Sequence, residues 1–73
     1  MKYSLITVLS ERNGLVNGNW IQDVTGELKD AIACARATER ANSNRITVAV
    51  VPELAGCGAS AYDTRTGLRR LDT

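Results

Sequence analysis

The fold is decided by residues 3–24, which read YSLITVLSERNGLVNGNWIQDV. The first part, Tyr3–Ser10, is rich in β-branched and apolar residues with polar residues spaced through it, which predicts a strand. Both faces of this strand are partly apolar, so we expect it to be central and covered on two sides. Asn-Gly follows twice, at 13–14 and 17–18, and either pair can make a tight turn because both residues tolerate a positive φ. The stretch therefore predicts a hairpin that pairs Tyr3–Ser10 with Asn19–Asp23.

The next segment, Thr25–Asn42, predicts a helix. Thr25 can cap its first turn, where acidic residues are favoured by the helix dipole. The sequence Asn42-Ser43-Asn44 should end the helix, because Asn adopts the left-handed conformation readily. An alanine-rich apolar stripe at helical spacing would let this helix lie close on a sheet, and its members are Val24, Leu28, Ala31, Ile32, Ala35 and Thr38.

A strand and a last hairpin are predicted after the helix. Arg45–Val51 carries apolar residues on both faces and should stop at Pro52. A last hairpin should pair Ala59–Asp63 with Leu68–Leu71 around a turn at Thr64–Gly67. The order strand-strand-helix-strand-strand predicts a small α+β fold.

A single α+β domain is expected to span residues 1–73, with one helix packed on one face of the sheet. The two best-defined strands have apolar residues on both faces, and the chain offers one helix to cover them. We therefore expect the second face to be covered by another copy of the chain, in a homodimer or a larger homo-oligomer.

Composition bounds the class of protein. Of the 73 residues, 44% are hydrophobic and 23% are charged, and the net charge is +1, which indicates a globular protein without a polybasic arm. The sequence has no apolar run of the length that crosses a bilayer and no small-residue cleavage site near its start. A cytoplasmic location is the resulting expectation, with no membrane as a partner.

Catalysis is disfavoured by the residue types present. The chain has no His, which removes the commonest general base and a common metal ligand. Its two cysteines are too few for a zinc site. Cys34 fits a small buried residue of the helix, and Cys57, between two glycines, fits a passive loop thiol. The sequence therefore predicts a protein that is not an enzyme and that holds no metal or cofactor.

Arginine is the one uneven feature, because seven of the nine basic residues are Arg. Arg binds phosphate or carboxylate through a planar fork and stacks on bases. A hypothetical site for an anionic or nucleotide ligand, or for a host protein, takes in the clustered arginines and two aromatic residues: Arg65, Arg69, Arg70, Tyr62, Arg36, Arg40 and Trp20. The alternatives are a solvated charged face for the arginines and a core anchor for Trp20.

The chain resembles, in general style, the short accessory and counter-defence proteins of bacteriophages and prophages. It is compact, its first strand begins directly at Met1-Lys2-Tyr3, and it carries no catalytic signature. The resemblance implies a non-enzymatic binding protein that sequesters or blocks a host defence component, such as a nucleotide ligand or a protein. A small nucleic-acid-binding protein is the alternative, and a small enzyme is a weaker one.

Overall fold

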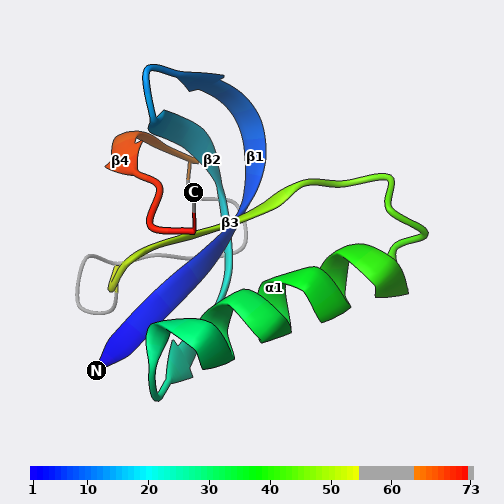
Figure 1. Cartoon of the computed structure of the whole chain (residues 1–73). Helices are drawn as coiled ribbons and strands as arrows, with labels where there is room; N and C mark the ends of the chain where they lie inside the picture. The colour runs from blue at the N-terminus through cyan, green and yellow to red at the C-terminus, as the bar shows by residue number, and fades with distance from the viewer. Residues whose placement is uncertain (55–63, 73) are drawn as a thin grey trace.

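The computed structural model describes residues 1–54 and 64–72, and these form an α+β fold in the predicted order (Figure 1). The elements are β1 (Lys2–Arg12), β2 (Leu15–Thr25), α1 (Leu28–Ala41), β3 (Val48–Pro52) and β4 (Thr64–Arg69). The strands pair antiparallel in the order β3-β1-β2-β4, which makes β1 and β2 the central pair. The predicted fold class is thus confirmed.

The hairpin of β1 and β2 turns at Asn13-Gly14. These two residues have φ values of 56° and 78°, the left-handed pair that a tight two-residue hairpin turn requires. The turn places Arg12 opposite Leu15, and both strands are longer than predicted. The second Asn-Gly pair lies inside β2 instead, where Gly18 faces Val8 beside a bulge in β1.

The helix begins three residues later than predicted, at Leu28. Thr25 is the last residue of β2, and Gly26, with φ of 143°, takes the chain out of the strand. Glu27 is the N-cap, and its backbone N–H donates to Asp30 Oδ2 at 3.0 Å. The predicted end is confirmed, because the left-handed residues Ser43 and Asn44 follow directly on the Asn42 cap.

One core lies between α1 and the sheet, as the apolar stripe predicts. Ala31 and Ala35 are fully buried and let the helix lie close to β1 and β3. The sheet contributes Tyr3, Leu5, Val48 and Val50 to this core, and Figure 1 shows α1 lying along that face.

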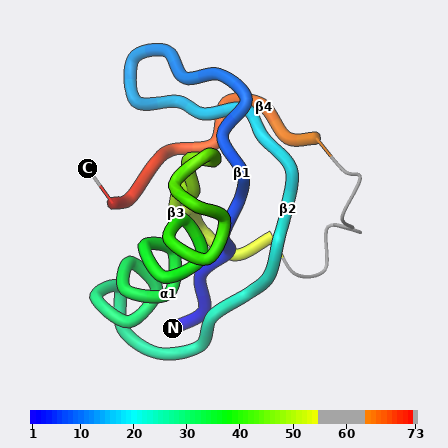
Figure 2. Tube along the Cα trace, turned by 90° about the vertical axis from the view of Figure 1, so that its right-hand side faces the viewer, coloured from blue at the N-terminus to red at the C-terminus, as the bar shows by residue number. Residues whose placement is uncertain are grey.

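A second core fills the other face of the sheet, and the chain itself encloses it. Ile6, Ala49 and Val51 are fully buried there, together with Val16, Leu54 and the flanking Val8, Trp20 and Leu68. The sheet curls from β3 through β1 and β2 to β4 (Figure 2), and after β4 the Leu71 N–H donates to the Val50 carbonyl at 2.8 Å. The premise that this face needs a second copy is therefore wrong, and assembly stays a prediction that would require another surface.

The strands after the helix differ in extent from those predicted. β3 starts at Val48 and keeps Pro52 as its last residue, opposite Tyr3. The predicted turn at Thr64–Gly67 is wrong, because these residues belong to β4, in which Thr64 and Arg65 pair with β2. Gly67 does have a positive φ, 70°, but it sits in a bulge where β4 carries one residue more than β2.

The other half of the predicted hairpin, Ala59–Asp63, lies outside the described residues. Across the described ranges, no helix has both the length and the apolar character needed to span a membrane.

Candidate functional site

Two of the predicted ligand-binding arginines lie on the same buried carboxylate. The side chain of Asp72 is 1% exposed. Its Oδ2 accepts a hydrogen bond from Arg36 Nη2 and its Oδ1 accepts one from Arg70 Nε, each at 2.7 Å. Arg36 comes from the middle of α1, and Arg70 follows β4 directly. Asp72 therefore joins the C-terminal tail to the helix.

The charged contacts continue on both sides of Asp72. Arg36 Nη1 lies 3.3 Å from Glu39 Oε1, and Glu39 Oε2 accepts the Val48 N–H at 2.8 Å. On the other side, Arg70 Nη1 lies 2.9 Å from Glu11 Oε1. We call these five side chains the Asp72 network: Glu39, Arg36, Asp72, Arg70 and Glu11.

Both arginines of the network have carboxylate partners in their own chain. Burial alone would lower the pKa of Arg70, but the contacts with Asp72 and then Glu11 outweigh burial and raise that pKa above its usual value. The guanidinium group stays charged and engaged at all ordinary pH values. These contacts favour a structural role for Arg36 and Arg70, and ligand binding by them stays a prediction.

The remaining predicted residues are scattered. Arg40 is exposed near the end of α1, and Arg69 is exposed at the end of β4. Arg65 is half-buried on β4 and makes contacts of its own. Tyr62, like Cys57, lies outside the described residues. The structure therefore does not gather the predicted set into one described site.

A row of exposed side chains crosses the sheet at the hairpin turn instead. Arg12 on β1 pairs with Leu15 on β2, and Leu15 pairs in turn with Arg69 on β4. Residues directly opposite one another in an antiparallel sheet point to the same face. We call Arg12, Leu15 and Arg69 the arginine–leucine row.

The row has an apolar centre between two positive charges. Leu15 is 42% exposed, and both arginines are exposed. Across residues 1–54 and 64–72, no ion pair joins Arg12 or Arg69 to an acid. Two strand spacings separate the arginine backbones by roughly 10 Å. The arginines can therefore contact two separate anionic groups on either side of Leu15.

Sequence analysis placed Arg69 among the candidates but missed Arg12 and Leu15. The sequence did contain the needed information, because a two-residue turn at Asn13-Gly14 places Arg12 opposite Leu15. With two Asn-Gly pairs available, the sequence left the register undecided.

A partly buried polar cluster was also missed. Ser4 is fully buried on β1, donates its hydroxyl proton to Asp23 Oδ1 and accepts the Leu54 N–H at 2.8 Å. Trp20 Nε1 donates to the same Asp23 oxygen at 3.0 Å. Trp20 also packs against the second core, which favours its interpretation as a core anchor.

These donors stabilise the charged form of Asp23. The hydrogen bond from Ser4, followed by that from Trp20, lowers the pKa of Asp23 below its usual value, and burial opposes this only in part. Asp23 therefore stabilises the fold above the pKa it has in the unfolded chain. This contribution is lost as the pH falls through the lowered folded-state pKa.

Replacing Asp23 by asparagine should lower the free energy of unfolding by about 1.5 kcal/mol at pH 7, because hydrogen bonds to a charged acceptor become bonds to a neutral one. The difference from wild type should shrink as the pH falls below about 4. Urea unfolding between pH 7 and pH 3 measures it, with Glu53→Gln, a change in an exposed ion pair, as the control. A difference that stays constant over this range would contradict the role of the Asp23 charge.

Within the parts of the chain that the structure describes, no group of His, Cys, Asp and Glu side chains is arranged to hold a metal ion. Comparisons with protein-family models, with curated proteins and with solved structures find no match for this chain.

Proposed function

We propose that this protein is a non-enzymatic binding protein that blocks a host protein, as the phage counter-defence proteins that it resembles in style do. The observation that carries the proposal is the arginine–leucine row. Its exposed leucine between two exposed arginines is the combination that a protein surface with acidic and apolar groups would bind.

The chemistry of the row suits a protein partner. Each guanidinium group can take a carboxylate through two parallel hydrogen bonds, and Leu15 can enter an apolar pocket between them. The nearest acid on β1, Glu11, is held by Arg70, so the positive charge of the row is not compensated there. A single phosphate would meet one arginine, whereas an acidic protein surface can meet both.

The position of the row also suits docking. The turn of the β1–β2 hairpin and α1 lie on opposite sides of the molecule, so the row is clear of the helix (Figures 1 and 2). A second apolar side chain, Leu9, is 61% exposed on β1 at the bulge near the turn. Together these side chains give the hairpin end a basic and apolar surface.

The double variant Arg12→Glu/Arg69→Glu should lose the blocking activity, because attraction to the target becomes repulsion. Strains that each carry one phage-defence system are challenged with a sensitive phage, with and without the protein. Wild type should restore plaque formation in a strain whose defence it blocks, and the double variant should not. Arg40→Glu/Arg45→Glu, an equal charge change in the last turn of α1 and in the segment after it, is the matched control and should keep the activity.

A dose series separates blocking from catalysis. A blocking protein inhibits the purified target in proportion to the molar ratio, whereas an enzyme inactivates an excess of it. Failure of the wild-type protein to restore plaque formation in any of the strains would contradict the proposal. Equal activity of the two charge variants would contradict it as well. Inhibition of the target at far below equimolar protein would revive the alternative of a small enzyme, and relief of inhibition by added nucleotide would favour a nucleotide ligand.

A further inference from the structure

The arginine–leucine row presents three side chains in line on one face of the sheet. Leu15 lies directly opposite Arg12 on one side and directly opposite Arg69 on the other. Neighbouring strands are about 4.8 Å apart, so the backbone of Leu15 lies roughly 5 Å from that of each arginine. The row therefore offers a partner three contact points in a fixed order: a positive charge, an apolar group and a second positive charge.

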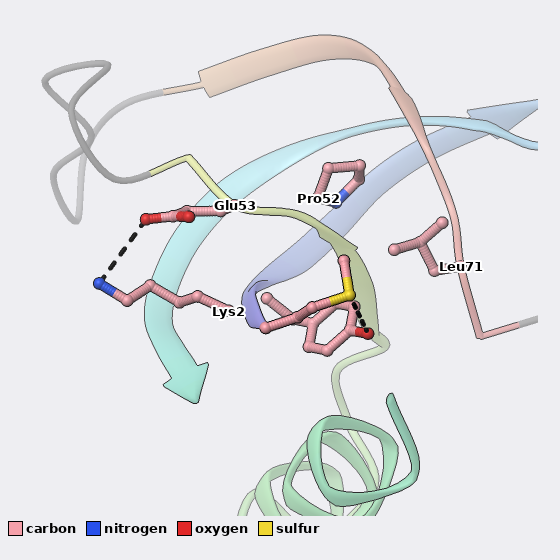
Figure 3. Close-up of a pocket in the computed structure, with 6 residues that line it drawn as sticks. Lys2, Pro52, Glu53 and Leu71 are labelled. Carbon is pink, nitrogen blue, oxygen red and sulfur yellow. Dashed lines mark hydrogen bonds and ion pairs between the residues drawn. The ribbon is translucent and has the colours of Figure 1, made fainter. Parts of the chain in front are cut away.

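The cavity at the start of β1, about 530 Å³ in volume, lacks such an arrangement (Figure 3). Its ion pair, Lys2 and Glu53, lies at the outer edge, away from Leu71. Lys2 and Tyr3 are successive residues of β1, so their side chains leave opposite faces of the strand. One ligand could not contact these groups together, whereas one partner can contact all three members of the row at once.

The backbone at the centre of the row is already paired on both sides. Leu15 belongs to β2, which pairs with β1 on one side and with β4 on the other. An extended segment gains its affinity for a sheet by adding to a free edge, and Leu15 offers none. A segment bound on the face of a sheet has to satisfy its own backbone groups, as an α-helix does. The position of the row therefore favours a helical partner.

The spacing of the three contact points also fits a helix. Residues i and i+7 of an α-helix lie on the same side of the helix and about 10.5 Å apart, with residues i+3 and i+4 between them. Side chains on one face of a strand repeat about every 6.8 Å, so three of them span roughly 13–14 Å. The two arginine backbones are roughly 10 Å apart. The helical spacing therefore matches the row, and the extended spacing is several ångströms too long.

We propose that the row binds an exposed α-helix of the target protein that carries acidic residues at i and i+7 and apolar residues at i+3 and i+4. Each acid pairs with one arginine, and Leu15 packs between the two apolar side chains. This inference rests on the proposed function, because it specifies the form of the target segment that the same row binds. A helix with its two acids on opposite sides would meet only one arginine.

Titration of the ¹⁵N-labelled protein with designed peptides tests the proposal. The first peptide is an alanine-based helix of about 20 residues, long enough to form in water, with two glutamates seven residues apart and leucines three and four residues after the first glutamate. The amide signals of Arg12, Leu15 and Arg69 should shift and saturate at low salt, with a Kd on the order of 1 mM. The second peptide has the same composition, but its second glutamate lies two residues further along, on the opposite side of the helix. It should bind about tenfold more weakly, because one charge-assisted contact is lost.

Arginine variants show whether both ends of the row take part. Arg12→Gln and Arg69→Gln should each weaken binding of the first peptide about tenfold. Each should also remove most of the difference between the two helical peptides, because the second glutamate then has no arginine to meet. Arg40→Gln, which changes an exposed arginine of α1, is the matched control and should leave both affinities unchanged.

A short unstructured peptide with the sequence glutamate-threonine-leucine-threonine-glutamate represents an extended partner. Three results would overturn the helical partner: no saturable shift with the first peptide, equal affinities for the two helical peptides, or tighter binding of the extended peptide. Plaque formation that still depends on Arg12 and Arg69 would then leave the proposed function standing. If instead the first peptide binds as expected and no strain is restored, the blocking function fails and the helix contact remains. The amide spectra themselves report whether each variant is folded.

Discussion

Asp72→Ala is expected to lower the free energy of unfolding by about 3 kcal/mol, because it leaves two arginines without their shared carboxylate. The Asp72 side chain is 1% exposed, and that of Arg70 is 11% exposed, so water cannot fully replace the lost contact. A domain of this length has a total stability of roughly 4–11 kcal/mol. The loss would therefore remove a large share of it.

Urea unfolding of the variant measures this loss, with Arg40→Ala as a control for an exposed arginine of the same helix. Amide exchange gives a second readout. The Leu71 N–H, bonded to the Val50 carbonyl, should exchange faster in Asp72→Ala, because Asp72 holds the tail against the helix. Equal unfolding of Asp72→Ala and the control would show that the Asp72 network contributes no net stability.

Elements that are specified by their own residues were predicted correctly. The alternation in β1, the alanine stripe of α1 and the asparagines after it are local patterns, and each forms the predicted element. The start of α1 was misplaced because Gly26 breaks the chain after Thr25 and Asp30 accepts from the backbone of Glu27. Thr25 was the only cap predicted, and Glu is not among the residue types that N-caps favour, so the later start had no clear local signal.

Features that depend on contacts distant in sequence were not predicted. Gly67 has the positive φ that its residue type suggested, but pairing with β2 makes it part of a bulge rather than a turn. The segment after β4 returns to β3, where the Leu71 N–H donates to the Val50 carbonyl. Hydrophobic pattern alone shows that a face is apolar and does not show which part of the chain covers it.

Prediction of the candidate site from the sequence was limited by the same dependence on contacts between distant residues. The sequence gives the positions of the arginines but not their partners, and Arg70 and Glu11 are 59 residues apart. Arg36 and Asp72 are separated by 36 residues. By contrast, the opposition of Arg12 and Leu15 follows from the turn between them, so this half of the row was within reach of local reasoning.

Gly18→Ala is expected to have the largest effect of any substitution proposed for this chain. A Cβ atom at residue 18 would lie 1.8 Å from the carbonyl oxygen of Thr7 and 2.8 Å from its carbonyl carbon. These are backbone atoms of the central strand β1, so no side-chain rotation can relieve the overlap. Separation of β1 from β2 at this point would disturb the second core, to which the neighbouring Val16 belongs. We expect a loss of about 4 kcal/mol or more, enough to unfold much of the protein.

Gly14→Ala is the matched control, because it changes the other glycine of an Asn-Gly pair in the same hairpin. Nothing lies within 4 Å of a Cβ atom at residue 14, and its φ is 78°. Only the left-handed backbone is strained, at a cost of about 1 kcal/mol, so this variant should stay folded. Circular dichroism and urea unfolding of the two variants measure the difference. The two glycines differ in what surrounds them. Equal stability of the variants would therefore mean that β1 can move away from β2 at the bulge. The close contact at Gly18 would then not hold β1 and β2 together.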